Sequence, residues 1–239
     1  MSRWRAFAIH LLISVLIAGS VAAVLFLVWY PPKLLGFAGA EGLLFLMAGI
    51  DIVVGPLLTL IVFKAGKKSL KFDLSVIALA QAAFLAYGVW TSWVSRPVFI
   101  VAVKGDLEVV FANDIADDEL AKAKDQAYAS LPWGKPKLVG TNLSASESVD
   151  NLFLAFAGKD IAQRPELYVP YEQSASNVIA RSMSIEDAIA SEPRLTEQFK
   201  AAQAKHPDAR VARVYSARAG AYMLIDPASA QPLMAVWWK

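Results

Sequence analysis

The sequence contains no cysteine and only two histidines, His10 and His206. Disulfides and thiolate chemistry are therefore excluded, and no His/Cys metal site can be assembled. No HExxH, no glycine-rich phosphate loop and no GxGxxG pattern is present either. His206 precedes Pro207 in a polar turn, which is a poor place for the base of a nucleophilic triad. We therefore expect no catalytic residue, no cofactor and no metal, and we interpret the acids Asp117–Glu119 as a solvated helix start.

A basic stripe is also lacking from most of the chain. Residues 1–93 hold seven Lys/Arg against three acids, whereas residues 94–239 hold sixteen Lys/Arg against eighteen acids. A nucleic-acid-binding surface would need clustered positive charge in the polar part. We therefore expect no nucleic-acid partner, and the positive excess belongs to the apolar part.

What the sequence has in abundance is hydrophobic residues, at 56%, which exceeds the usual share in a soluble domain. The excess lies in three runs long enough to cross a bilayer, at about 7–29, 42–63 and 73–93. The first run is too long for an ordinary signal peptide. We predict a membrane domain over 1–93 and a water-soluble domain over 94–239.

Positive charge predicts the orientation of these three spans. Arg3, Arg5 and the four lysines of the loop 64–71 fall on one side, and only Lys33 falls on the other. Basic residues favour the cytoplasmic side. We therefore expect a cytoplasmic N-terminus and, in a Gram-negative cell, an inner-membrane protein with its second domain in the periplasm.

The second run carries an acid, Asp51, near its middle, followed by Gly55 and Pro56. A charge at that depth costs roughly 2.5–3.5 kcal/mol on insertion scales, so something should compensate it. Pro56 lacks an N–H and should free the carbonyl four residues earlier, that of Ile52. Gln81 of the third run lies near the same depth and can hydrogen-bond Asp51. Two interpretations stay open: Asp51 only holds the helices together, or Asp51, Gly55, Pro56 and Gln81 form a docking surface for a membrane segment of a partner.

The second domain reads as an α+β fold on a mostly antiparallel sheet. A hairpin is predicted over 98–111, and a closing hairpin is predicted from 213–226 and 232–238 around the turn 227–231. Between them we expect the following segments: helices over 115–130, 146–157 and 184–204 (the last interrupted at Pro193), a short strand over 137–140, and an extended segment over 163–171.

Several motifs together resemble the type IV pilin accessory proteins of Gram-negative bacteria. They comprise WYPP at 29–32, GIDIVVGPLLT at 49–59, GKKSLKFDL at 66–74, Tyr87-Gly88, Arg96-Pro97 and Gln163-Arg164-Pro165. The resemblance covers the membrane half closely and the second half mainly at segment ends. It implies an inner-membrane chaperone or stabiliser of a type IV pilin, contacting the membrane helix and the head of the pilin and other pilus assembly proteins. The family carries no catalytic residues over to this sequence.

Two other classes of function remain open. A sensory or regulatory protein could bind a small ligand through its outer domain, although only a leader and one short loop are then left for a cytoplasmic output. A membrane enzyme such as a pilin-modifying transferase lacks candidate residues. Co-purification with a pilin would distinguish the accessory protein from both.

Overall fold

In the computed structural model, the chain folds as two compact units. The structure describes residues 2–31, 34, 37, 41–142 and 160–237. One unit comprises Met1–Tyr30 and Gly39–Val94, and the other comprises Pro31–Ala38 and Ser95–Lys239. The segment between the first two spans thus belongs to the second unit. The helix predicted over 146–157 lies outside the described residues.

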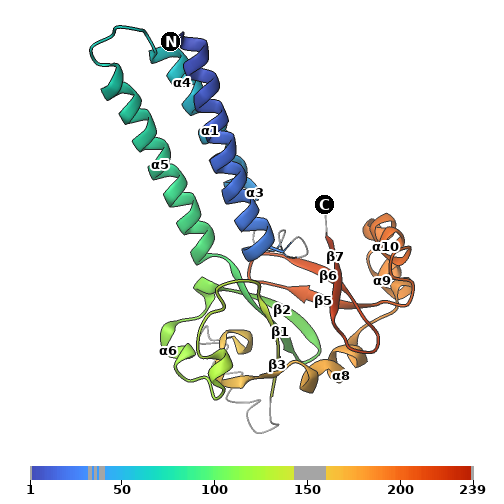
Figure 1. Ribbon diagram of the computed structural model, residues 1–239. Helices are drawn as coiled ribbons and strands as arrows, with labels where there is room; N and C mark the ends of the chain where they lie inside the picture. The colour runs from blue at the N-terminus through green and yellow to red at the C-terminus, as the bar shows by residue number, and fades with distance from the viewer. Residues whose placement is uncertain (1, 32–33, 35–36, 38–40, 143–159, 238–239) are drawn as a thin grey trace. The chain divides into compact units, whose positions relative to one another are not determined.

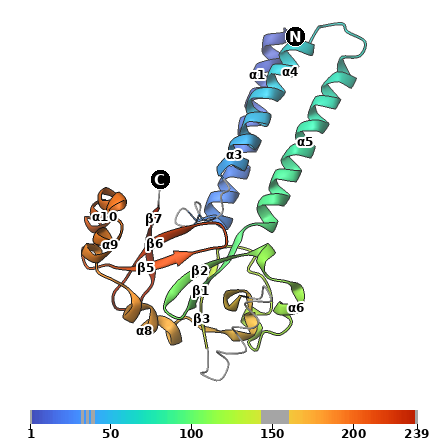
Figure 2. The same ribbon diagram turned by 180° about the vertical axis from the view of Figure 1, so that it is seen from behind.

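Three helical rods form the first unit (Figures 1 and 2). Their parts are α1 (Arg3–Val24) with the π-helical turn η1 (Leu25–Trp29), α3 (Glu41–Ala48) with the π-helical turn η2 (Gly49–Val54) and α4 (Gly55–Val62), and α5 (Leu70–Val94). All three rods are long and apolar enough to cross a membrane, over Arg3–Trp29, Phe45–Val62 and Leu70–Val94. The three predicted apolar helices are confirmed, and the third begins three residues earlier than expected.

Polar and aromatic contacts join the first and third rods at one end. The hydroxyl of Tyr30 donates to the Ser92 carbonyl at 2.7 Å, and the rings of Trp29 and Trp93 lie 5.0 Å apart. Amphipathic rings of this kind favour the membrane–water boundary. At the other end, the Ser2 side chain caps α1 by accepting from the Arg5 N–H at 3.3 Å.

The second unit is built on one seven-stranded sheet with strand order β4-β3-β1-β2-β5-β6-β7. Its strands are β1 (Pro97–Val103), β2 (Asp106–Phe111), β3 (Lys137–Thr141), β4 (Tyr168–Pro170), β5 (Arg210–Tyr215), β6 (Gly220–Ile225) and β7 (Pro232–Trp237). Its α-helices are α6 (Asp117–Leu120), α8 (Glu172–Arg181), α9 (Ile185–Ser191) and α10 (Thr196–Gln203), and single 3-10 turns cover Ala112–Asp114, Gln126–Tyr128, Ile161–Gln163, Pro165–Leu167 and Pro193–Leu195.

The prediction of a mostly antiparallel sheet is corrected, because this sheet is mixed. The predicted hairpin β1–β2 is present, but β1 pairs in parallel with β3 and β2 pairs in parallel with β5. Parallel neighbours need long crossover connections, and such connections leave no short turn signal in the sequence. The hairpins β5–β6 and β6–β7 complete one side of the sheet.

Both faces of the sheet are buried. One face carries Leu107, Val109 and Phe111 of β2, with Val178 of α8 packed beside them. The other carries Val98, Val101 and Val110 and is covered by the loop segments around Ile115, Tyr128 and Ala162. A third cluster lies under α9 and α10 around Phe199 and Leu224.

Leu34 and Phe37, from the segment between the first two spans, belong to the first of these clusters. Phe37 is completely buried, and its ring lies 4.1 Å from that of Trp237 in β7. The core of the second unit is therefore assembled from residues that precede the second rod in the sequence and residues that follow the third.

Two sequence predictions for this unit were wrong in detail. The helix expected over 115–130 is reduced to α6, because the side chain of Asp125 accepts from the Ala127 N–H and starts a separate turn. The closing segment 213–226 is two strands, β5 and β6, joined by the turn at Ser216–Ala219. The helix predicted over 184–204 is present as α9 and α10 with the expected break at Pro193, and Ser184 caps α9 through the Asp187 N–H.

Candidate functional site

The π-helical turn η2 places Asp51 and shifts the backbone hydrogen bonds around it. Gly55 donates its N–H to the carbonyl of Ile50, five residues back instead of four. In that register the next N–H would serve the Asp51 carbonyl, but the next residue is Pro56, which has none. The carbonyl of Asp51 is therefore left without a helical donor, whereas the sequence prediction, made for an α-helical register, had named the carbonyl of Ile52.

Gln81 of α5 supplies the missing donor. Its Nε2 donates to the Asp51 carbonyl at 3.2 Å. A side chain at Gly55 would collide with the Gln81 amide, so only glycine leaves room for it. The structure thus brings together the four residues singled out from the sequence, with Pro56 creating the acceptor that Gln81 satisfies.

A cavity of about 140 Å³ opens between the second and third rods beside Asp51. Its lining is otherwise apolar or small: Leu46, Met47, Ile50, Phe84, Leu85, Tyr87 and Gly88. Gly88 lets α5 approach α3, since a Cβ there would meet the Met47 side chain. Asp51 is only 5% exposed, so its carboxyl group borders an apolar recess instead of open solvent.

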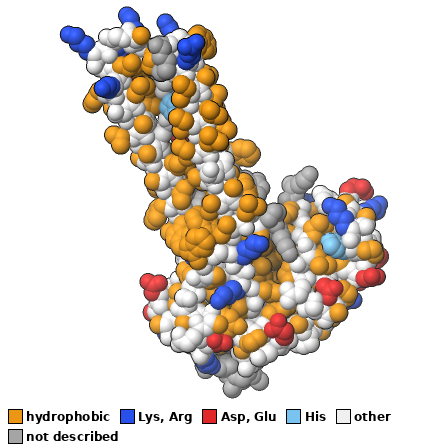
Figure 3. All heavy atoms as spheres, viewed as in Figure 1, with side chains coloured by type: hydrophobic (Ala, Val, Ile, Leu, Met, Phe, Trp, Pro, Cys, Tyr) orange, Lys and Arg blue, Asp and Glu red, His pale blue; other side chains and the backbone are white. Residues whose placement is uncertain are grey.

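The rim of this recess is strongly apolar. Phe84 and Tyr87 are 56% and 62% exposed, and the ring of Tyr87 lies 6.1 Å from that of Trp90. In Figure 3 hydrophobic side chains cover the visible face of the helical unit, and Lys and Arg side chains gather at the end that carries the N-terminus. We call the recess with its rim residues Phe84 and Tyr87 the Asp51 groove.

A second polar contact joins the first and second rods and was not anticipated. His10 Nδ1 and Thr59 Oγ1 lie 2.6 Å apart and share a hydrogen bond whose direction depends on the ring tautomer. The sequence marks His10 only as the one titratable group of the first apolar run, at about 7–29.

In the second unit, Glu108 of β2 is an acid buried within the sheet, where its surroundings disfavour the charged carboxylate. It is 7% exposed and lies between Val101 and Tyr215 of the neighbouring strands. Burial, with the charges of Asp160 and Asp114 adding to it, raises the pKa of its carboxyl group to about 8. Nothing in the sequence marked Glu108, because an acid in an alternating strand reads as an exposed position.

The remaining candidates do not form a reactive constellation within the described residues. The prediction of a solvated helix start holds for Asp117 and Asp118, which are exposed, but it is wrong for Glu119, which is buried. Glu119 accepts from the Lys122 ammonium at 2.8 Å, and Asp118 lies 3.5 Å from the same ammonium. No group of three side chains able to hold a metal is found among the residues that the structure describes.

Comparison with known proteins identifies the family. The profile of the fimbrial assembly protein FimB matches residues 1–32. A fimbrial assembly protein of serogroup E1 from Dichelobacter nodosus is 33% identical over 174 residues, which cover 71% of this chain and 67% of the relative. Another, of serogroups C1 and C2, is 36% identical over 117 residues, covering 48% of this chain and 89% of the relative. No solved structure matches the chain.

The chain therefore belongs to the FimB family of fimbrial assembly proteins, and the resemblance to type IV pilin accessory proteins is confirmed. The family supports a role in pilus assembly, and the three apolar helices support membrane association.

Proposed function

We propose that this protein is an inner-membrane chaperone or stabiliser that holds a type IV pilin before assembly. The observation that carries the proposal is the Asp51 groove, an apolar recess at bilayer depth bordered by a buried acid. A pilin waiting in the membrane has one apolar helix with an amine and an acid near its start. An apolar groove with one carboxyl group is complementary to such a helix if the amine reaches Asp51.

Physical cost favours a functional Asp51. The hydrogen bond from Gln81 already satisfies the backbone carbonyl of Asp51, so an alanine at this position would leave no unpaired backbone group. A carboxyl group nevertheless remains there, at roughly 2.5–3.5 kcal/mol of insertion cost. Intramembrane acids of this kind are functional by default. In the proposed complex the pilin amine offsets that cost.

The proposed orientation places the N-terminus and the α4–α5 loop in the cytoplasm and the second unit in the periplasm. The basic residues of both segments lie at the same end of the helical unit (Figure 3), as the positive-inside rule requires. With this orientation the second unit lies on the side where pilin heads are displayed. The proposal involves no cofactor and no catalytic step.

Crosslinking in intact cells tests the proposal. A photoreactive amino acid at Tyr87, on the rim of the groove, should capture the pilin. The matched control is Leu12 of α1, which is also apolar and 61% exposed but does not line the groove. Equal capture from both positions, or from neither, would contradict a specific groove.

The Asp51→Asn variant separates recognition from helix packing. It keeps the size and hydrogen-bonding capacity of the side chain and removes its charge. We expect normal amounts of the variant in the membrane, with reduced pilin crosslinking from Tyr87 and fewer surface pili. Normal crosslinking and normal pili in Asp51→Asn would mean that the pilin does not bind the charge of Asp51. Normal pili in Asp51→Ala would contradict both interpretations, recognition of the pilin and helix packing.

A further inference from the structure

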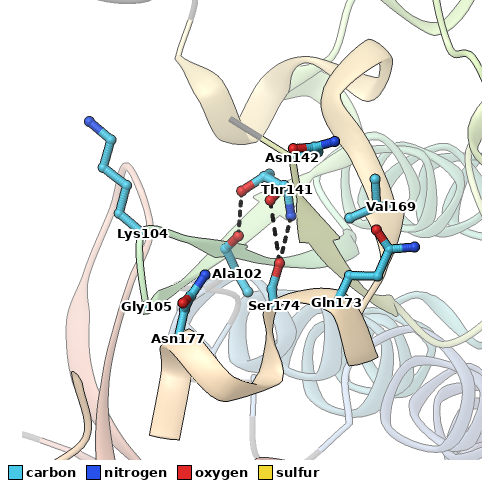
Figure 4. A pocket seen from close by; sticks show the side chains of 9 residues that line it. All are labelled: Ala102, Lys104, Gly105, Thr141, Asn142, Val169, Gln173, Ser174 and Asn177. Atoms are coloured by element: carbon cyan, nitrogen blue, oxygen red, sulfur yellow. Dashed lines mark hydrogen bonds between the residues drawn. The ribbon is translucent and has the colours of Figure 1, made fainter. Parts of the chain in front are cut away.

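A polar pocket of about 310 Å³ lies in the second unit, at the end of the sheet where α8 begins. Three pieces of chain form it: the β1–β2 turn, the adjoining ends of β3 and β4, and the exposed side of α8. The lining residues, drawn in Figure 4, are Ala102, Lys104, Gly105, Thr141, Asn142, Val169, Gln173, Ser174 and Asn177. This volume is within the range of small-ligand and peptide sites.

Hydrogen bonds fix the floor of this pocket. The Ser174 hydroxyl accepts from the Thr141 N–H at 3.1 Å, and Thr141 Oγ1 donates to the Ala102 carbonyl at 2.7 Å. These bonds, the dashed lines of Figure 4, tie α8 to β3 and β3 to β1. The floor is therefore already organised before any ligand arrives.

The walls, in contrast, carry polar groups that are not used by the fold. Asn142, Gln173 and Asn177 are exposed, and within the described part of the chain their carboxamides make no hydrogen bond. Figure 4 shows Asn177 on one side of the floor and Asn142 with Gln173 on the other. Each carboxamide offers two N–H donors and one carbonyl acceptor, so it can pair with both the carbonyl and the N–H of a peptide backbone.

Lys104, the one charged residue among the described lining residues, occupies a backbone conformation that lysine rarely adopts. Lys104 and Gly105 have φ angles of 51° and 91°, as the two central residues of a type I′ hairpin turn require. Asparagine or glycine is preferred at the first of these positions, and a non-glycine residue there is strained by roughly 1–2 kcal/mol. Packing also requires glycine at position 105, since a Cβ there would lie 2.7 Å from the backbone carbonyl oxygen of Asn177. Strained positions of this kind concentrate at ligand sites.

We propose that this pocket binds a short extended peptide that carries a carboxylate. The carboxamides of Asn142, Gln173 and Asn177 bind the amide groups of the peptide, and the ammonium of Lys104 binds its carboxylate. Among the described residues the lining contains no acid, which disfavours a cation, and no aromatic ring on which a sugar could stack. The site lies within the second unit and does not depend on the Asp51 groove.

Peptide titration of the full-length protein in lipid nanodiscs, followed by calorimetry, tests the site. The probes are an acetylated tetrapeptide of glycine and alanine with a free terminal carboxylate, the same peptide as an amide, and an amidated peptide with one internal aspartate. We expect saturable binding of at least one carboxylate peptide and weaker binding of the amide by roughly tenfold, the usual effect of one charge-assisted hydrogen bond. The two carboxylate peptides distinguish a terminal from a side-chain carboxylate. Absence of binding by all three, or equal binding of all three, would overturn the proposal.

Lys104→Asn separates binding from folding. Asn-Gly is the favoured type I′ pair, so the thermal midpoint should stay the same or rise while carboxylate selectivity is lost. Asn177→Ala should weaken the binding of all three peptides and keep the preference for a carboxylate, because Lys104 is unchanged. Lys205→Asn, at an exposed lysine outside the lining, is the matched control and should bind as the wild type does. Wild-type selectivity in Lys104→Asn, or an equal loss in the control, would refute the assignment.

Discussion

Glu108 makes the stability of the second unit depend on pH in an unusual direction. Its carboxyl pKa is about 8 in the folded chain against a reference value of 4.5, so the folded state binds the proton more tightly. Stability from this group is therefore fully present below pH 4.5 and is lost as the pH rises through 8. Between pH 5.5 and pH 8 the expected loss is about 3 kcal/mol. Glutamine has the same shape and stays neutral, so Glu108→Gln should remove this dependence.

Pulse proteolysis in urea measures this difference on the full-length protein in detergent. At pH 5.5 we expect the variant and the wild type to have similar free energies of unfolding. At pH 8 the free energy of unfolding of the variant should exceed that of the wild type by about 3 kcal/mol, which corresponds to a midpoint shift of roughly 1–3 M urea. Glu197→Gln, which removes a carboxyl group that is 87% exposed, should leave the pH profile of the wild type unchanged. A wild-type-to-variant difference that does not grow between the two pH values would refute the reasoning about the buried Glu108.

Three further predictions concern the helical unit, the shared core and topology. Gly55→Ala should lower the stability of the detergent-purified protein by about 1–3 kcal/mol in thermal unfolding, because the new methyl group displaces Gln81. In the Gly55→Ala background, Gln81→Ala should destabilise the protein less than it does in the wild type. Strictly additive effects of the two substitutions would contradict the contact between Gly55 and Gln81. Phe37→Ala should lower the stability of the second unit, measured by pulse proteolysis, by about 3–5 kcal/mol, whereas Leu12→Ala should not. A phosphatase active only outside the cytoplasm should work when fused after Lys239 and fail when fused within Lys64–Lys71, and the reverse pattern would overturn the proposed orientation.

Elements with a strong local pattern could be predicted from the sequence. The three apolar runs, the β1–β2 hairpin and the capped start of α9 at Ser184 each depend on neighbouring residues, and all are present. Helix α8 was missed because its buried face includes the polar Ser174 beside Val178, so its apolar spacing is weak. The parallel pairs were missed because they depend on distant segments.

The candidate site shows the same division. Asp51, Pro56 and Gln81 could be selected because polar residues and proline are rare in apolar runs. The π-helical register could not be foreseen, since it is stabilised by a donor from another helix, Gln81. Glu108 was missed because its burial is produced by loop segments that cover the sheet, and no local pattern encodes that cover.

The place of Leu34 and Phe37 in the core of the second unit has a consequence for biosynthesis. A ribosome makes these two residues before the second and third spans, but Trp237, the ring that Phe37 contacts, is made some 200 residues later. Leu34 and Phe37 therefore remain uncovered while the second and third apolar helices are synthesised. This part of the core can close only after β7 has left the ribosome, so premature termination before β7 should yield a nascent chain that quality-control proteases recognise.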